Sequence, residues 1–237
     1  DPLFTFPMLV GVIWALCLKK ESRKRSRVVT LTSVWISFYT CISFLLLSLA
    51  QREFEQQFDA AGITPDKTFT SCTLGNIFLW RHLAQDDENY YVSYWSVWDS
   101  DDRLVEIDTI ARTPELAIPY KESRVFQTLD WFSQGWWKLT PVSENSVVFV
   151  DMRFAEMHQI DGDNSRKIPP FIWHMTLDKD GSVQESRASV KGDFKPKLTI
   201  KELGQRIIGR SPEWMTPTWP WDPTKTLSPE SETERID

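Results

Sequence analysis

The feature that most constrains this chain is an apolar run near its start, VVTLTSVWISFYTCISFLLLSLA, over residues 28–50. Its 23 residues contain no charged residue, no proline and no glycine. A helix rises about 1.5 Å per residue, so this run is long enough to cross the hydrocarbon core of a bilayer, which is about 30 Å thick. A buried core helix is the alternative, but core helices rarely stay uncharged over such a length. The run therefore predicts a membrane span.

A second apolar run, LFTFPMLVGVIWALCL, occupies residues 3–18. It has 16 residues, which is slightly short for a span, and Pro7 and Gly11 favour a bend. A cleaved signal peptide is the rival interpretation, but it needs a basic segment before the apolar run. Here DP comes first and the basic residues follow. We therefore predict a second span, so that residues 1–50 form a transmembrane helical hairpin.

A strongly basic segment, residues 19–27, joins the two runs. It holds six Lys and Arg residues against Glu21, a net charge of +5. Cytoplasmic loops of membrane proteins are rich in Lys and Arg, so this loop is predicted to lie inside, with both chain ends outside. Anionic lipid headgroups would also attract it. Residues 28–237 hold 21 cations and 31 anions. The predicted partner is therefore a lipid bilayer and not a nucleic acid.

Beyond the hairpin, residues 51–210 have the pattern of one α+β domain with a mostly antiparallel sheet. The segment AQREFEQQFDAAGITPDK predicts a short amphipathic helix that continues from the second span. Turn sequences such as QDDE, DSDD, SEN and KDG separate strand-like runs. The predicted strands are 76–84, 89–98, 103–111, 136–142, 146–154, 171–178 and 182–190, and the predicted helical segments are 113–123, 123–135 and 199–208. Residues 211–237 are proline-rich and are predicted to be disordered or loosely packed.

The sequence of the soluble part contains no familiar catalytic motif, and its catalytic residues stay unknown at this stage. It has no G-x-S-x-G elbow, phosphate loop or H-E-x-x-H motif. Cys72 is the one cysteine beyond the spans, so neither a disulfide nor a Cys-based metal site is predicted there. DGDNSR and DKDG lack further oxygen ligands at calcium-loop spacing and are interpreted as turns. His82 and His174 lie in strand-like runs and are interpreted as packed or surface residues; an envelope enzyme that uses either with an acidic partner is a weaker hypothesis.

Tryptophan is unusually frequent in the soluble part. Ten of the twelve tryptophans follow the second span. An indole is apolar with one hydrogen-bond donor, so an exposed tryptophan can stack on a sugar ring or rest at a membrane surface. A bulky aromatic core beside the bilayer is the simpler alternative, and both interpretations stay open here.

Several charged residues fall in apolar strand-like runs. Arg81 follows Asn76 and Trp80 in N-x-x-x-W-R, and Asp151 and Arg153 belong to D-x-R-F. An unpaired buried charge is very costly, so an arginine in such a place needs a carboxylate. Asp151 and Arg153 are two residues apart and would share one strand face. We predict a structural ion-pair network at these positions rather than a catalytic one.

Taken in order, several segments resemble a known family. DPLFTFPMLVG, a basic loop and a second span resemble the C-terminal half of the bacterial membrane-bound metal-dependent hydrolases, also described as LexA-binding, inner-membrane-associated hydrolases. NIFLWR, YYVSYWSVWD, WFSQGWW and DMRF resemble the soluble extension that many members carry. The resemblance covers about residues 1–155 and rests on the order of the segments rather than on any one motif.

The resemblance implies an integral-membrane, metal-dependent hydrolase of the bacterial inner membrane, with an extracytoplasmic soluble domain. In the family, a divalent metal is bound mainly by His and acidic residues of an N-terminal membrane half, including a His-Arg-Gly-x-Thr-His-Ser type of motif that this sequence does not contain. Asp1 is the one position that matches an acidic residue near that site. We therefore expect a C-terminal fragment that associates with upstream membrane helices and binds no cofactor by itself.

Two functional hypotheses result. In the first, the chain is the C-terminal part of a metal-dependent hydrolase, and its soluble domain positions the substrate or a partner. In the second, it is a non-enzymatic, membrane-anchored binding or sensing module with an aromatic-rich sheet, which the tryptophan content favours. The sequence upstream of Asp1 distinguishes them, because the hydrolase requires a membrane segment with His and Asp residues there.

Overall fold

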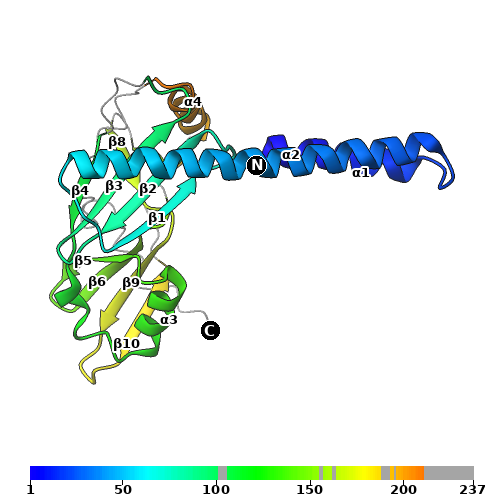
Figure 1. Cartoon of the computed structure of the whole chain (residues 1–237). Helices are drawn as coiled ribbons and strands as arrows, with labels where there is room; N and C mark the ends of the chain where they lie inside the picture. Colours follow the sequence, from blue (N-terminus) through cyan, green and yellow to red (C-terminus); the bar gives the residue numbers. More distant parts are fainter. Residues whose placement is uncertain (101–105, 155–156, 162–163, 188–192, 195, 211–237) are drawn as a thin grey trace.

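The computed structural model describes residues 1–100, 106–154, 157–161, 164–187, 193–194 and 196–210. In these residues, an N-terminal helix pair is followed by an α+β region with two four-stranded antiparallel sheets and a smaller three-stranded one. Figure 1 shows the helix pair extending away from the β region, while one of its helices continues across the first sheet. The predicted order of a helix pair and an antiparallel α+β region is therefore confirmed, but the strands form several sheets and not one. The proline-rich tail lies outside the described residues.

The element bounds are as follows. The helices are α1 (Pro2–Cys17), α2 (Arg23–Ala60), the 3₁₀ helix η1 (Pro114–Ala117), α3 (Arg124–Ser133) and α4 (Pro196–Ile207). The first sheet has the order β1-β2-β3-β4, with strands Lys67–Cys72, Leu79–Gln85, Asn89–Ser96 and Asp108–Ala111. The second has the order β10-β9-β6-β5, with strands Val183–Arg187, Ile172–Leu177, Ser146–Asp151 and Trp137–Ser143. The third has the order β11-β7-β8, with strands Asp193–Phe194, Met157–Asp161 and Asn164–Ile168.

Helix α2 begins inside the basic segment that was predicted to be a loop. Ser22 caps it, because the Ser22 hydroxyl accepts a hydrogen bond from the Lys24 backbone N–H at 3.2 Å. Lys and Arg are good helix formers, so the helix includes most of the basic residues. The connection between α1 and α2 is thus reduced from 19–27 to 18–22. The helix then runs without a break to Ala60, so its predicted amphipathic continuation is confirmed.

Two contacts hold helices α1 and α2 together, one at the start of α1 and one halfway along it. Asp1 caps α1 by accepting from the Leu3 N–H at 2.8 Å, and its second oxygen accepts from the Tyr39 hydroxyl at 2.6 Å. Halfway along, a Cβ added to Gly11 would lie 2.0 Å from Thr32 Oγ1. Glycine therefore permits the close approach of the two helices at this point.

By length and composition, α2 is the one helix in the described part of the chain that could cross a membrane, and α1 is a shorter apolar helix. The last turns of the predicted span do not project freely. Leu46 and Ala50 are buried with Ile77 and Trp80 of the β region. One face of α2 is therefore covered over these turns, while Phe44, Leu45 and Leu49 stay exposed on the rest of the helix.

The first sheet lies between α2 and the second sheet. Along β2, His82 and Ala84 contact the α2 side chains, whereas Leu83 on the opposite face belongs to a core cluster with Val148 and Val150 of β6. The other face of β6 packs against α3 through a second cluster. Strand β6 is buried along its whole length because it is covered on both faces.

The strand predictions fail mainly where the sequence is polar. Strand β1, KTFTSC, was not predicted, because it lies at the edge of the sheet and is largely exposed or half-buried. Strands β7 and β8 were not predicted either, although DGDNSR was interpreted as a turn and Asp161 at the end of β7 pairs with Asn164 at the start of β8. The predicted strand residues 103–105 and 188–190 lie outside the described ranges.

We predict that Gly11→Ala weakens the helix pair. The added methyl group meets Thr32, so the helices must separate, and the melting temperature of the detergent-solubilised chain should fall. Thr32→Ala in the same chain should restore part of the loss. Gly204→Ala in α4 is the matched control, because a Cβ there meets nothing within 4 Å. An equal effect of the two alanine substitutions would contradict this account.

Candidate binding surface

The structure brings Asp151 and Arg153 together as an ion pair. Asp151 is fully buried at the end of β6, and its Oδ2 lies 2.6 Å from Arg153 Nη2. Its Oδ1 accepts from Arg153 Nε and from the Arg153 backbone N–H, both at 3.0 Å. The prediction that the two residues share one strand face was wrong, because β6 ends at Asp151 and Arg153 lies beyond the strand. The pair therefore fixes the turn after β6.

Arg81 reaches the same turn from the first sheet. It is buried in β2, and its Nη1 donates to the Arg153 backbone carbonyl at 3.3 Å. Among the described residues, its Nε has no hydrogen-bond acceptor. Arg81 therefore links the two sheets beside the Asp151–Arg153 pair.

Asn76 and Trp80 serve other places in the fold. The Asn76 amide donates to Thr73 Oγ1 at 2.8 Å, and its Oδ1 accepts from the backbone N–H groups of Phe78 and Leu79 at 2.9 and 2.7 Å. Asn76 thus orders the β1–β2 connection. Trp80 is buried under α2. Neither residue lies in a common site with the Asp151–Arg153 pair.

Asp1, the candidate metal ligand, is engaged as the cap of α1 and as the acceptor for Tyr39. Within the described ranges, no group of three or more His, Cys, Asp or Glu side chains is placed to hold a metal ion. These residues therefore do not fit a divalent-metal centre of the kind that the family resemblance implies.

His82 is enclosed by the C-terminal part of α2. Its ring stacks on Phe54 with centroids 4.7 Å apart and meets the edge of Phe58 at 5.1 Å. Its Nδ1 shares a hydrogen bond of 2.7 Å with the Thr70 hydroxyl. Burial, followed by the positive charge of Arg81, lowers the pKa of His82 to about 4. A neutral, enclosed imidazole is a packing element between α2 and the first sheet.

The end of α3 carries exposed aromatic and polar side chains. Ser123 caps this helix, and its hydroxyl accepts from the Phe126 N–H at 3.1 Å. Phe126 and Leu129 face the second sheet, which leaves Trp131 on the outer face with 79% of its surface exposed. The helix ends where Gln134 adopts a left-handed conformation, with φ of 56°.

The end of α3 is fixed by contacts from other elements. Lys67 of β1 donates to the Gln134 carbonyl at 2.8 Å, which places a cation at the negative end of the helix dipole. Its ammonium group also lies 4.6 Å from the centre of the Trp136 ring. The Asp130 carboxylate accepts from Trp137 Nε1 at 2.6 Å. The last turn of α3 is thus a rigid platform.

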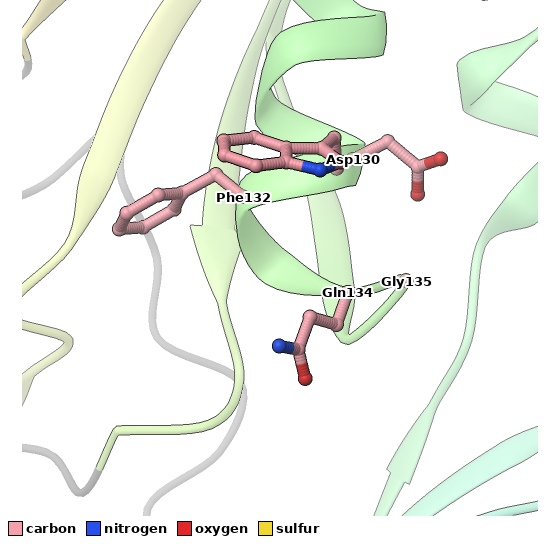
Figure 2. A pocket seen from close by; sticks show the side chains of 5 residues that line it. Asp130, Phe132, Gln134 and Gly135 are labelled. Carbon is pink, nitrogen blue, oxygen red and sulfur yellow. The ribbon is translucent and has the colours of Figure 1, made fainter.

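An open hollow of about 570 Å³ surrounds this turn; we call it the α3 hollow. Figure 2 shows Asp130 and Phe132 projecting to different sides of the turn, with Gln134 below its end. The lining residues are Asp130, Trp131, Phe132, Gln134 and Gly135. The hollow therefore combines two exposed rings with a carboxylate and a side-chain amide, which suits a ligand with both apolar faces and hydroxyl groups.

Comparisons with known protein families, curated proteins and solved structures found no match for this chain.

One edge of the α3 hollow continues into a cluster of rings from three segments. Phe132 contacts Trp173 of β9 at 5.7 Å, and Phe171 contacts Phe154 at 4.5 Å, both between ring centroids. The Arg153 guanidinium lies over the Phe132 and Phe154 rings, at 5.2 and 5.4 Å from their centres. The buried ion pair at Asp151 thus holds the arginine that orders this edge.

Sequence reasoning missed a second buried ion pair. Asp99 binds both terminal nitrogens of Arg206 at 2.7 Å, and Arg206 Nη2 also donates to the Tyr94 carbonyl at 2.9 Å. The pair attaches α4 to the end of β3. Asp99 was interpreted as part of an acidic turn, and Arg206 lies 107 residues away, so no local pattern joins them.

We predict that the unfolding free energy falls as the pH drops from 6.5 towards 4, in part because of His82. The unfolded state gains a proton near pH 6.5, whereas the folded state does so only near pH 4. This difference amounts to about 3 kcal/mol, fully present above pH 6.5. Urea unfolding at several pH values should show a smaller decline in His82→Gln. An unchanged decline in that variant would show that His82 titrates normally.

We also predict that Asp151→Asn destabilises the chain by about 3 kcal/mol, because it leaves the largely buried Arg153 without its carboxylate. Urea unfolding measures the effect. Asp66→Asn is the matched control, since Asp66 is exposed and should contribute close to nothing. Equal stability of the two variants would rule out a structural role for the pair.

Proposed function

We propose that this chain is a membrane-anchored binding domain of the bacterial inner membrane, with its β region on the extracytoplasmic side. The observation that carries the proposal is the α3 hollow, which offers exposed rings and polar groups on a rigid platform. The other candidate residues, among them Arg81, Asp151 and His82, are used in contacts that hold the fold together.

The anchor is supported by the apolar surface of the helix pair. The helix pair extends away from the β region (Figure 1). Large side chains on both helices are exposed, including Phe6, Leu31 and Phe44. Such a continuous apolar surface is unfavourable in water and is covered when lipid surrounds it. The basic residues at the start of α2 support an orientation with the α1–α2 connection in the cytoplasm.

The ligand we propose is a sugar-containing polymer of the cell envelope. A sugar ring presents C–H groups on its faces and hydroxyl groups at its edge. Trp131 and Phe132 provide rings for the faces, while Asp130 and Gln134 provide an acceptor and a donor for the hydroxyls. A polymer would also suit a domain whose distance from the bilayer is set by its anchor.

The family resemblance supports a wider version of the same proposal. In a metal-dependent hydrolase, this domain would position the polymer, and membrane helices preceding Asp1 would supply the ligands of the divalent metal. The binding role of the α3 hollow is the same with or without that enzyme.

The test is the affinity of the full chain, in detergent micelles, for an oligomer of β-1,4-linked N-acetylglucosamine. We expect Trp131→Ala to weaken binding by about tenfold, because it removes one stacked ring from an exposed position. Trp98→Ala is the matched control, since Trp98 is an exposed tryptophan outside the α3 hollow. Isothermal titration measures both. Absence of binding, or equal weakening by the two variants, would reject the proposed ligand.

A further inference from the structure

A rigid turn between β1 and β2 presents an exposed leucine beside the base of the hairpin. Leu74 is 88% exposed, although both neighbouring strands are ordered. Asn76 holds the turn by its bonds to Thr73, Phe78 and Leu79, and Gly75 adopts a φ of 77°. The fold therefore holds the apolar side chain of Leu74 outward, at a defined position.

This turn lies at the level where the apolar helix α1 begins. A Cβ added to Gly75 would lie 3.7 Å from Cδ of Pro2, the first residue of α1. The preceding residue, Asp1, is hydrogen-bonded to Tyr39, which is well inside the apolar run of α2. Ile77, at the end of the turn, is buried in one cluster with Tyr39 and other α2 residues. In Figure 1, β1 accordingly ends toward the base of the hairpin.

The hairpin is also apolar and uncovered between this level and the contact of α2 with the β region. Phe44 and Leu45 of α2 are exposed, by 67% and 59% respectively, while the next residue, Leu46, is buried against the β region. The apolar surface of α2 is thus continuous around the helix with the side that carries the turn. A bilayer that covers Phe44 and Leu45 extends to the level of Leu74.

We propose that the β1–β2 turn inserts Leu74 into the outer boundary of the same bilayer that the hairpin spans. This inference rests on the spanning hairpin of the proposed function and is independent of the ligand of the α3 hollow. A leucine at the boundary between headgroups and acyl chains loses its contact with water, so insertion is favourable. The β region would then contact the membrane at two places, the hairpin and this turn.

The test uses single cysteines in a chain with Cys17→Ser, Cys41→Ser and Cys72→Ser. Leu74→Cys, Leu31→Cys and Ile118→Cys each carry an environment-sensitive fluorophore, and the full chain is reconstituted in vesicles of phosphatidylethanolamine and phosphatidylglycerol. Leu31 reports on the hairpin. Ile118 is the matched control, because it is an aliphatic residue with 71% exposure that follows η1 and does not belong to the cluster of Ile77 with the α2 residues. Quenching by a lipid-borne nitroxide is compared with quenching by aqueous iodide.

We expect lipid quenching at positions 31 and 74, and iodide quenching at position 118. Lipid quenching at position 31 with iodide quenching at position 74 would overturn the inserted turn and leave the spanning hairpin intact. Iodide quenching at position 31, whatever happens at position 74, would overturn the hairpin and the inference with it. The same lipid quenching at positions 74 and 118 would also reject it, because the contact would then not be specific to the turn.

Discussion

The packing of α2 over the first sheet is the constraint on which the β region depends. Helix α2 is uninterrupted, and its surface changes along its length from apolar to amphipathic. In the amphipathic part, Phe54 and Phe58 enclose the neutral His82 of β2. This contact covers the outer face of the first sheet. The opposite face is then available for the second sheet, whose own outer face is covered by α3. Each layer thus depends on the layer before it.

Two buried ion pairs fix segments that follow the central strands β6 and β3. Asp151 and Arg153 fix the turn after β6, and through the arginine they order the rings that border the α3 hollow. Asp99 and Arg206 attach α4 to the end of β3. Each carboxylate accepts two side-chain hydrogen bonds from its arginine, so the cost of burying the charges is offset by specific contacts. The Phe132 ring at the edge of the α3 hollow is therefore held by Arg153, which is in turn held by the fully buried Asp151.

The sequence was informative where a physical signal is local. The charge-free length of the apolar runs predicted the helix pair. Helical periodicity predicted the continuation of α2 beyond residue 50, and helix α3 was also predicted. Apolar runs predicted the central strands β2, β3 and β6. Edge strand β1 and the β7–β8 hairpin were missed because polar, half-covered strands carry no such pattern. The Asp99–Arg206 pair joins distant segments, and the exposure of Trp131 depends on which face of α3 meets the second sheet. Neither can be obtained from spacing alone.

The continuity of α2 has a mechanical consequence. A chain with a flexible linker between anchor and domain can swivel and search a volume around its attachment point. Here no residue between the basic start of α2 and Ala60 interrupts the helix, and its final turns are part of the core. The helix pair and the β region that α2 covers therefore tilt and rotate together. A change in the tilt of the helix pair would therefore change the orientation of the α3 hollow, and a force on the hollow would be transmitted to the helix pair.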